Sequence, residues 1–316
     1  MGAGIVVWVA VLVVVAAVAA GLALFLSRRR GPVVSLSIEG NTIRVVSCQG
    51  RRVSAWKSIP FNPTLLQGGF VANAAGLSQV LKSALRDVKA GRVIVALPGF
   101  QSVSRVIALP KVKGLRPAVA VPREARRLMG VSLDSSYLFW QSLASAGTQW
   151  RFFVLAVPRV PLLALIDALR QAGIRPWKID TKPLALARAV NQGHAVVGSL
   201  ESNSIDVVVV LDHAPVVIRS LFLGEEAVVP EVVLPRFVEE VSRTITFYND
   251  INRGNPLPRT VPIYLCGALS GNPEVGREIE RATGHQVGQA DAVLSYPPDF
   301  PVSQMMVNLG LVMKAL

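Results

Sequence analysis

The chain has 316 residues and a formal net charge of +13, with 51% hydrophobic and only 17% charged residues. Because a soluble chain usually carries about 25% charged residues, part of this chain is expected to lie outside water. Two cysteines exclude a disulfide scaffold and a cysteine-rich metal site, and the three histidines share no ligand spacing.

The excess of apolar residues lies at the start of the chain. Residues 2–27 carry no charged side chain, and Arg28, Arg29 and Arg30 follow directly. About 20 apolar residues suffice for a helix to cross a bilayer, whereas a secretory signal carries its positive charge before the apolar stretch. The pattern therefore favours an uncleaved transmembrane anchor with a basic flank, residues 1–30, over a signal peptide. By the positive-inside rule, the rest of the chain would lie in the cytoplasm, at the inner membrane.

Charge divides the chain into two parts. Residues 1–193 have a balance of +19, and residues 194–316 have a balance of −6. A basic part beside an anchor suits anionic membrane lipid, and it would equally suit an acidic protein partner. Nucleic acid is disfavoured as a partner, because the basic residues alternate with apolar side chains rather than with aromatic stacking positions.

The first part of the body reads as an α/β unit. Apolar and polar side chains alternate over residues 33–48 around Gly40 and Asn41, which predicts a β-hairpin. We expect the elements that follow to be a strand at 51–59, a helix at 73–88 and a strand at 92–97.

A block of short strands follows and then gives way to helical patterns. Within the block, strands are expected at 103–109, 137–143 and 150–157, and a short helix at 122–129. After the block, helices at 161–172 and 182–192 flank a strand at 175–179.

The motif of the first hairpin returns in the second part of the chain. Residues 37–46 read Ser-Ile-Glu-Gly-Asn-Thr-Ile-Arg-Val-Val, and residues 199–208 read Ser-Leu-Glu-Ser-Asn-Ser-Ile-Asp-Val-Val. Six of the ten positions are identical, and a third strand follows both copies. Two unrelated hairpins could share such turn chemistry. The match in register favours an internal duplication, with two similar halves that each open with a hairpin.

Further stretches complete a pattern that covers nearly the whole body. They are residues 96–99, 105–110, 155–158, 172–176, 179–180, 185–188, 241–248, 264–268 and 308–311. Together with the two hairpins, they resemble the actin-like ATPase fold, a duplicated RNase H-like α/β fold in which each hairpin turn cradles phosphates of a nucleotide. Within it the chain resembles the PilM family of type IV pilus assembly and, more distantly, the FtsA family of cell division. The anchor is a departure, since PilM proteins are usually soluble.

The resemblance implies a division of the chain into segments. The expected segments are the anchor and basic flank at 1–30, a first actin-like half at 31–97 and 159–193, an inserted small α/β subdomain at 98–158, and a second actin-like half at 194–316.

Both phosphate turns depart from the family pattern. The family's first phosphate motif is Asp-x-Gly-x-x-x-x-Lys, and its second begins Asp-x-Gly. In this sequence Ser37 and Ser199 replace the aspartates, which organise Mg²⁺ through water. Glu39 and Glu201 replace the glycines, which let backbone N–H groups approach phosphate. Arg44 stands where the family has lysine.

These departures predict a pseudo-ATPase without catalytic residues and without a resident cofactor or metal. Serine is a poor substitute for a carboxylate around Mg²⁺. A glutamate about 4 Å from a phosphate would cost about 4 kcal/mol at an effective dielectric of 20, unless its side chain turns into solvent. Two such repulsions would offset the binding free energy of a micromolar ligand, which is roughly 8 kcal/mol. The degenerate nucleotide cleft would be lined by Ser37, Glu39, Gly40, Asn41 and Thr42, by Ser199, Glu201, Ser202, Asn203 and Ser204, and by Gly267.

Several alternatives stay open from the sequence. The two glutamates could be solvated turn residues with no ligand nearby. A working ATPase could bind ATP and Mg²⁺ through shifted ligands, Asp180 or Asp206, although we favour a surface position for Asp206. Gly267 survives from the glycine-rich turn that lies beneath adenine in this fold, so binding of a nucleoside without hydrolysis is a further alternative.

The resemblance implies a scaffold that serves type IV pilus or type II secretion-like assembly. In the PilM family, a short cytoplasmic segment of the inner-membrane protein PilN docks in a groove. The equivalent groove would lie here between the first hairpin domain and residues 98–158. The alternatives are a membrane-bound assembly ATPase and a cell-division scaffold, and the sequence is compatible with a homo-oligomer.

Overall fold

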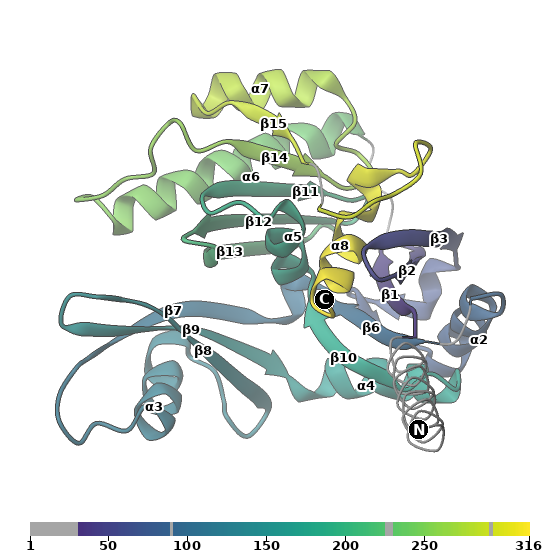
Figure 1. Cartoon of the computed structure of the whole chain (residues 1–316), viewed down its shortest axis with the longest axis horizontal. Coiled ribbons are helices and arrows are strands. Elements are labelled where there is room, and N and C mark those ends of the chain that lie inside the picture. Colours follow the sequence, from purple (N-terminus) through teal and green to yellow (C-terminus); the bar gives the residue numbers. More distant parts are fainter. Residues whose placement is uncertain (1–30, 89–90, 225–229, 291–292) are drawn as a thin grey trace, which may run out of the picture.

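Two five-stranded sheets form the centre of the molecule in a computed structural model that describes residues 31–88, 91–224, 230–290 and 293–316 (Figure 1). A smaller three-stranded sheet stands to one side of them. Among the described residues, no helix combines the length and the apolar character that a membrane crossing requires. The predicted anchor, residues 1–30, lies outside the described residues.

The first sheet has the strand order β10-β6-β1-β2-β3. Its strands are β1 (Val33–Glu39), β2 (Thr42–Gln49), β3 (Arg52–Pro60), β6 (Arg92–Leu97) and β10 (Pro176–Thr181). The first three are antiparallel neighbours, and β6 and β10 run parallel to β1. Helices α2 (Ala74–Leu85) and α4 (Arg159–Gln171) cover one face, where Leu36 of β1 packs with Leu77 and Leu165. Between β3 and α2 lie the short elements η1 (Pro63–Leu65), β4 (Leu66–Gln67) and β5 (Phe70–Val71).

The second sheet repeats this arrangement with the order β13-β12-β11-β14-β15. Its elements are β11 (Ala195–Leu200), β12 (Ser204–Leu211), β13 (Ala214–Phe222), α6 (Pro230–Ile251), β14 (Ile263–Cys266), α7 (Pro273–Thr283) and β15 (Val287–Gln289). Each sheet thus has a three-stranded antiparallel unit extended by two parallel strands. The shared order agrees with the duplication that the repeated hairpin motif predicts.

Two central helices lie between the sheets: α5 (Lys182–Val190) and α8 (Val302–Met313) (Figure 1). Their apolar side chains share one core with Val46 of the first sheet and Val208 of the second. The helices approach closely at Gly310, where a Cβ would collide with the carbonyl oxygen of Ala185. The two halves are therefore held together by a packed apolar layer as well as by the charged contacts described below.

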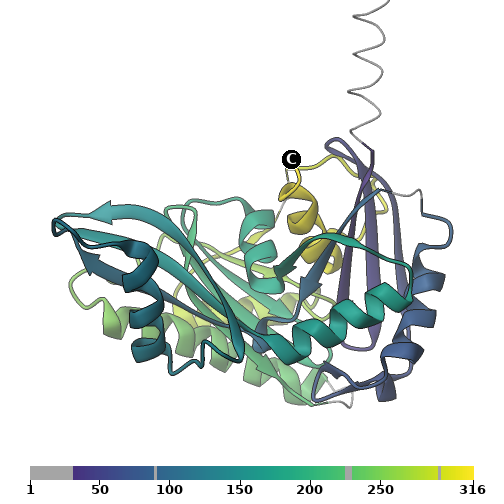
Figure 2. The ribbon, with the colours of Figure 1, turned by 90° about the horizontal axis from the view of Figure 1, so that it is seen from below.

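The inserted subdomain follows β6 through η2 (Gly99–Gln101) and leads directly into α4 (Figure 2). Its elements are β7 (Val103–Pro110), α3 (Pro117–Met129), β8 (Ser136–Ala146) and β9 (Gln149–Pro158), with the sheet order β7-β9-β8. The predicted helix start at Pro122 is wrong. Pro117 occupies the first turn, where its missing N–H is not needed, and burial of Val121 and Ala125 holds the helix through Pro122.

Candidate functional site

The two predicted phosphate turns meet between the two sheets. The first turn consists of Gly40 and Asn41, and the second connects Leu200 to Ser204. Gly40 has a φ of 60°, and a Cβ at this position would collide with the Ser202 hydroxyl. The two turns are therefore in direct contact.

Arg44 of β2 reaches from the first half to the second turn. Its guanidinium donates two hydrogen bonds to the Glu201 carboxylate, each 2.8 Å long, and a third of 2.9 Å to the carbonyl oxygen of Gln304. The Arg44 and Glu201 side chains are only 5% and 3% exposed. Burial alone would lower the pKa of Arg44, but the hydrogen bonds and charge of Glu201 raise it above its ordinary value. The result is a bidentate buried ion pair between the halves.

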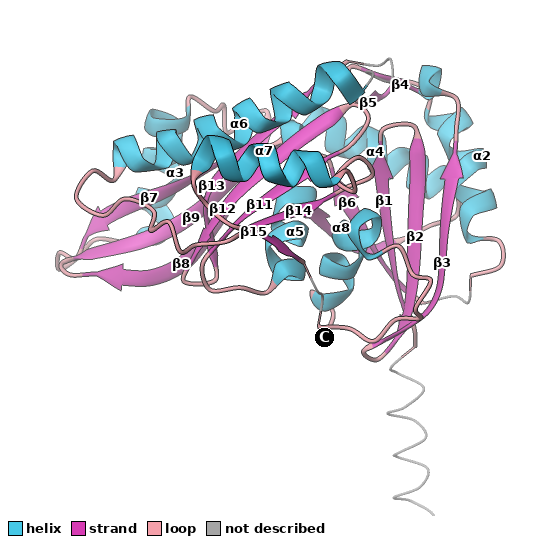
Figure 3. Cartoon of the chain, turned by 90° about the horizontal axis from the view of Figure 1, so that it is seen from above, coloured by secondary structure: helices cyan, strands magenta, loops and turns pink. Residues whose placement is uncertain are grey.

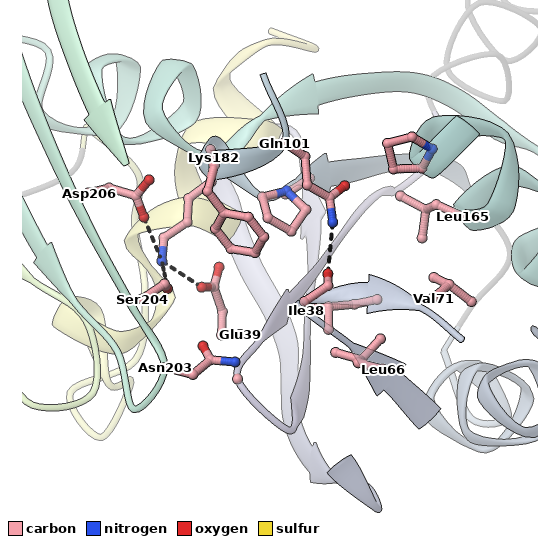
Figure 4. Close-up of a pocket in the computed structure, with 17 residues that line it drawn as sticks. Ile38, Glu39, Leu66, Val71, Gln101, Leu165, Lys182, Asn203, Ser204 and Asp206 are labelled. Atoms are coloured by element: carbon pink, nitrogen blue, oxygen red, sulfur yellow. Dashed lines mark hydrogen bonds and ion pairs between the residues drawn. The ribbon is translucent and has the colours of Figure 1, made fainter. Parts of the chain in front are cut away.

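Lys182, the first residue of α5, forms the second charged link (Figure 4). Its Nζ lies 2.7 Å from Oε2 of Glu39 and 3.1 Å from Oδ2 of Asp206, so it joins β1 to β12. Burial would lower the pKa of Lys182, but the charges of Glu39 and Asp206 raise it above its ordinary value. Burial raises the pKa of Glu39, and the Lys182 ammonium opposes that rise.

Three carboxylates therefore face two cations inside the protein. The side chains of Glu39, Lys182 and Asp206 are all at most 3% exposed. The interpretation of Glu39 and Glu201 as solvated turn residues is wrong, and so is the expected surface position of Asp206. The physical reason is tertiary structure, because each carboxylate is covered and neutralised by a cation distant in the sequence.

The two serines that replace the family's aspartates are also buried. The Ser37 hydroxyl donates to Oδ1 of Asn308 at 3.0 Å, while the Asn308 amide donates to the carbonyl oxygens of Ser35 and Arg44. Ser199 is 1% exposed and pairs in register with Cys266 of β14. Ser37 is thus engaged in joining α8 to the first hairpin.

Little space remains between the turns. The cavity there has a volume of about 30 Å³ and is lined by Glu39, Gly40, Lys182, Asn203 and Asp206, among others. One water needs roughly 10–15 Å³ of such volume, so the cavity has room for no more than two or three waters.

Gly267 and Asp180, two further predicted positions, have structural roles. Gly267 has a φ of 101°, and a Cβ there would collide with the Leu200 backbone, so glycine permits β14 to approach the second hairpin. Asp180 is paired with Arg188 at 2.9 Å and with Lys314 at 3.0 Å. Over the described part of the chain, no three or more His, Cys, Asp or Glu side chains are grouped to hold a metal ion.

Sequence reasoning missed Lys182 and Asn308 as members of this site. Lys182 has one local signal: a cation at the first position of a helix is opposed by the helix dipole, so nearby carboxylates would stabilise it. Asn308 has no local signal, because its partners lie on strands about 270 residues earlier in the chain.

Solved structures show which fold this is. The PilM-PilN type IV pilus biogenesis complex is similar with a TM-score of 0.74 and 22% identity, over 90% of this chain and 98% of that chain. The cytoplasmic domain of EpsL, an inner-membrane component of the type II secretion system of Vibrio cholerae, is similar with a TM-score of 0.53 and 12% identity, over 89% and 95%. AlfA, from a B. subtilis plasmid, has a TM-score of 0.50 and 9% identity, over 90% and 99%.

The chain has the actin-like ATPase fold, and the resemblance to PilM is confirmed at the level of structure. No family model matches the chain. No curated protein matches it either.

Proposed function

We propose that this chain is a membrane-anchored cytoplasmic scaffold with a degenerate, non-hydrolysing nucleotide cleft. It would recruit the cytoplasmic segment of an inner-membrane protein to a type IV pilus or type II secretion-like assembly. The observation that carries the proposal is the pair of buried charged links, Arg44 to Glu201 and Lys182 to Glu39 and Asp206, which join the two turns.

A magnesium–nucleotide complex does not fit these residues. A triphosphate between the turns would have to displace Lys182 or Arg44 and leave carboxylates unpaired in the interior. Breaking one buried ion pair in this way costs about 3–5 kcal/mol. Two such losses would offset most of the roughly 8 kcal/mol that binds a micromolar ligand. The obstacle is thus the loss of existing pairs, rather than the repulsion by free glutamates that the sequence suggests.

A groove beside the first sheet supports the recruiting role. It has a volume of about 420 Å³ and lies between β8 of the inserted subdomain and β10 of the first half. Phe139 and Trp140 of β8 line it and are 55% and 41% exposed, so two adjacent aromatic side chains give the groove a contiguous apolar surface, as binding sites have.

The two strands that border the groove favour an extended occupant. Both β8 and β10 are edge strands of their sheets. An extended apolar segment can pair with such an edge and place alternate side chains in the groove. This position agrees with the groove that the family resemblance implies, between the first half and residues 98–158.

The solved neighbours support an assembly role. One is a complex of PilM with PilN in pilus biogenesis, and another is an inner-membrane component of a secretion system. We therefore propose a PilN-like protein as the partner. The apolar residues 2–27 and the arginines that follow support membrane anchoring of the chain itself.

Peptide binding to the full chain in detergent or nanodiscs tests this function. The probe is a fluorescent peptide with the cytoplasmic N-terminal sequence of a PilN-like protein encoded beside this chain. We expect saturable binding without nucleotide, and a loss of about 30-fold in affinity for Trp140→Ala, the effect of one central aromatic contact worth about 2 kcal/mol.

Val119→Ala is the matched control, since Val119 is 67% exposed on α3 and does not line the groove. Absence of binding, or equal loss in both variants, would contradict the scaffold function. Binding that requires ATP would instead support the assembly-ATPase alternative.

A further inference from the structure

Strands β1 and β6 of the first sheet begin at the same end of the sheet, where the chain enters the body. Here the edge means this end of the sheet and not an outermost strand. Val33, the first residue of β1, pairs with Arg92 at the start of β6 and with Cys48 near the end of β2. The turn between β2 and β3, with Arg51 and Arg52, is consequently at the same edge (Figure 3).

This edge is basic. Arg51 in the β2–β3 turn and Arg52 at the start of β3 are exposed. Arg175 is exposed immediately before β10, which is aligned with the start of β6. Asp87 and Asp299 are carboxylates near the edge. Asp87 is paired with Lys57 at 2.8 Å, and Asp299 lies in the loop whose residue Ser295 bridges to Arg52.

An exposed tryptophan lies within this set of cations. Trp177, in the bulge of β10, is 42% exposed. Its ring is 4.4 Å from the Arg92 guanidinium carbon and 4.0 Å from the Lys178 ammonium. Tryptophan is enriched at the headgroup level of membranes, and the cations above its ring are oriented by the aromatic face.

We propose that this basic edge (Arg51, Arg52, Arg92, Arg175, Trp177 and Lys178) binds the anionic lipid headgroups of the bilayer. The inference rests on the proposed anchor at residues 1–30. Only Gly31 and Pro32 separate Arg30 from β1, and an extended chain spans about 3.3–3.6 Å per residue. The edge would therefore lie close to a bilayer that holds the anchor, at a distance comparable with the roughly 8 Å Debye length.

Such contact would fix the orientation of the body. The groove of the proposed partner is lined by Lys178, Ile179 and Asp180 of β10, the strand that begins at the basic edge. With the edge on the headgroups, the groove would lie near the membrane, where a cytoplasmic segment of a membrane protein emerges.

Energy transfer from the full chain to labelled lipid tests the inference. A donor is attached to Gln49→Cys at the edge or, as a control, to Ser132→Cys in the inserted subdomain; both positions are exposed. The native thiols of Cys48 and Cys266 are fully buried, and burial raises the pKa of each to about 12, so they do not compete for the label. The acceptor is a headgroup-labelled lipid in vesicles of phosphatidylcholine alone or mixed equally with phosphatidylglycerol.

We expect transfer from position 49 to be higher with phosphatidylglycerol than without it, and to fall with added salt. Transfer from position 132 should change less than transfer from position 49. Arg51→Gln with Arg52→Gln should reduce the gain in transfer that phosphatidylglycerol gives, while Arg51→Lys with Arg52→Lys should retain it. Equal transfer from position 49 in the two kinds of vesicle would overturn the proposal that the basic edge binds anionic headgroups.

Flotation of the same samples separates this inference from the anchor. Chains that float with both vesicles but show equal transfer support the anchor and overturn the edge. Chains that float only with phosphatidylglycerol, and only with Arg51 and Arg52 present, support the edge and overturn the anchor. Chains that float with neither overturn both.

Discussion

The two hairpins have the same backbone arrangement but carry side chains of opposite charge at one corresponding position. Arg44 of the first hairpin stands where Asp206 occurs in the second. Each hairpin also has a glutamate at its turn, Glu39 or Glu201. Because the second hairpin has an aspartate where the first has an arginine, only one direct arginine–glutamate pair forms between the hairpins, and Glu39 lies beside a second carboxylate.

One glutamate is paired directly with a cation of the other hairpin, and the other glutamate is linked to the opposite hairpin only through a third residue. Arg44 reaches Glu201 without an intermediary, but Asp206 and Glu39 are both acidic and share Lys182. Like charges in a low-dielectric interior are tolerated only with a compensating cation. The comparison teaches that Lys182 completes an arrangement that the duplicated hairpins alone could not neutralise.

The largest effect is expected from removing the bridge. Lys182→Met leaves Glu39 and Asp206 without their cation, so the free energy of unfolding should fall by about 5 kcal/mol, the upper end for a broken buried pair. Chemical denaturation of the detergent-solubilised chain measures this. Lys57→Met is the control, because its pair with Asp87 is exposed to solvent and contributes little to stability.

Neutralising the carboxylates should reverse the loss. Glu39→Gln with Asp206→Asn in the Lys182→Met background removes the unpaired charges, so most of the stability should return. A Lys182→Met chain as stable as the parent would show that the bridge does not matter.

The direct pair should give a somewhat smaller effect. Arg44→Met leaves one carboxylate unpaired, so a loss of about 3 kcal/mol is expected. A double-mutant cycle with Glu201→Gln should show strong coupling, with the double variant more stable than Arg44→Met alone. Additive losses would mean that the two residues act independently.

The apolar contact between the halves should be less sensitive. Gly310→Ala places a Cβ against the Ala185 carbonyl, which should cost about 1–3 kcal/mol of stability by overpacking. Gly271→Ala serves as the control, since a Cβ at that position would have no heavy atom within 4 Å. Equal thermal midpoints for the two variants would argue against close packing of α5 on α8.

The smallest expected effect is on the free energy of unfolding at alkaline pH. The pKa of Lys182 is raised above its ordinary value of 10.5, because the nearby carboxylates outweigh burial. The stability that this proton contributes is fully present below pH 10.5 and is lost as the pH rises above it. Over that range the parent should lose up to about 1.4 kcal/mol per pH unit more than Lys182→Met. If the free energy of unfolding of the parent and of Lys182→Met depended equally on pH, Lys182 would not be both buried and charged.

Local features of the sequence were sufficient to predict much of the fold. The alternation and the Gly40–Asn41 turn predicted the first hairpin, and the repeated motif predicted the second, since both depend on neighbouring residues. The site was predicted only in part. Its turns were identified, but Arg44 and Glu201 are 157 positions apart, and no local pattern shows which distant cation covers a carboxylate. The burial of Asp206 was missed for the same reason.

Calorimetric titration of the full chain with Mg²⁺ and ATP tests the central claim most directly. If the buried ion pairs have replaced the nucleotide, the parent chain should show no saturable heat at millimolar ATP and no release of phosphate. Micromolar binding accompanied by turnover would contradict the account, because it would require the Arg44 and Lys182 links to open readily for a triphosphate.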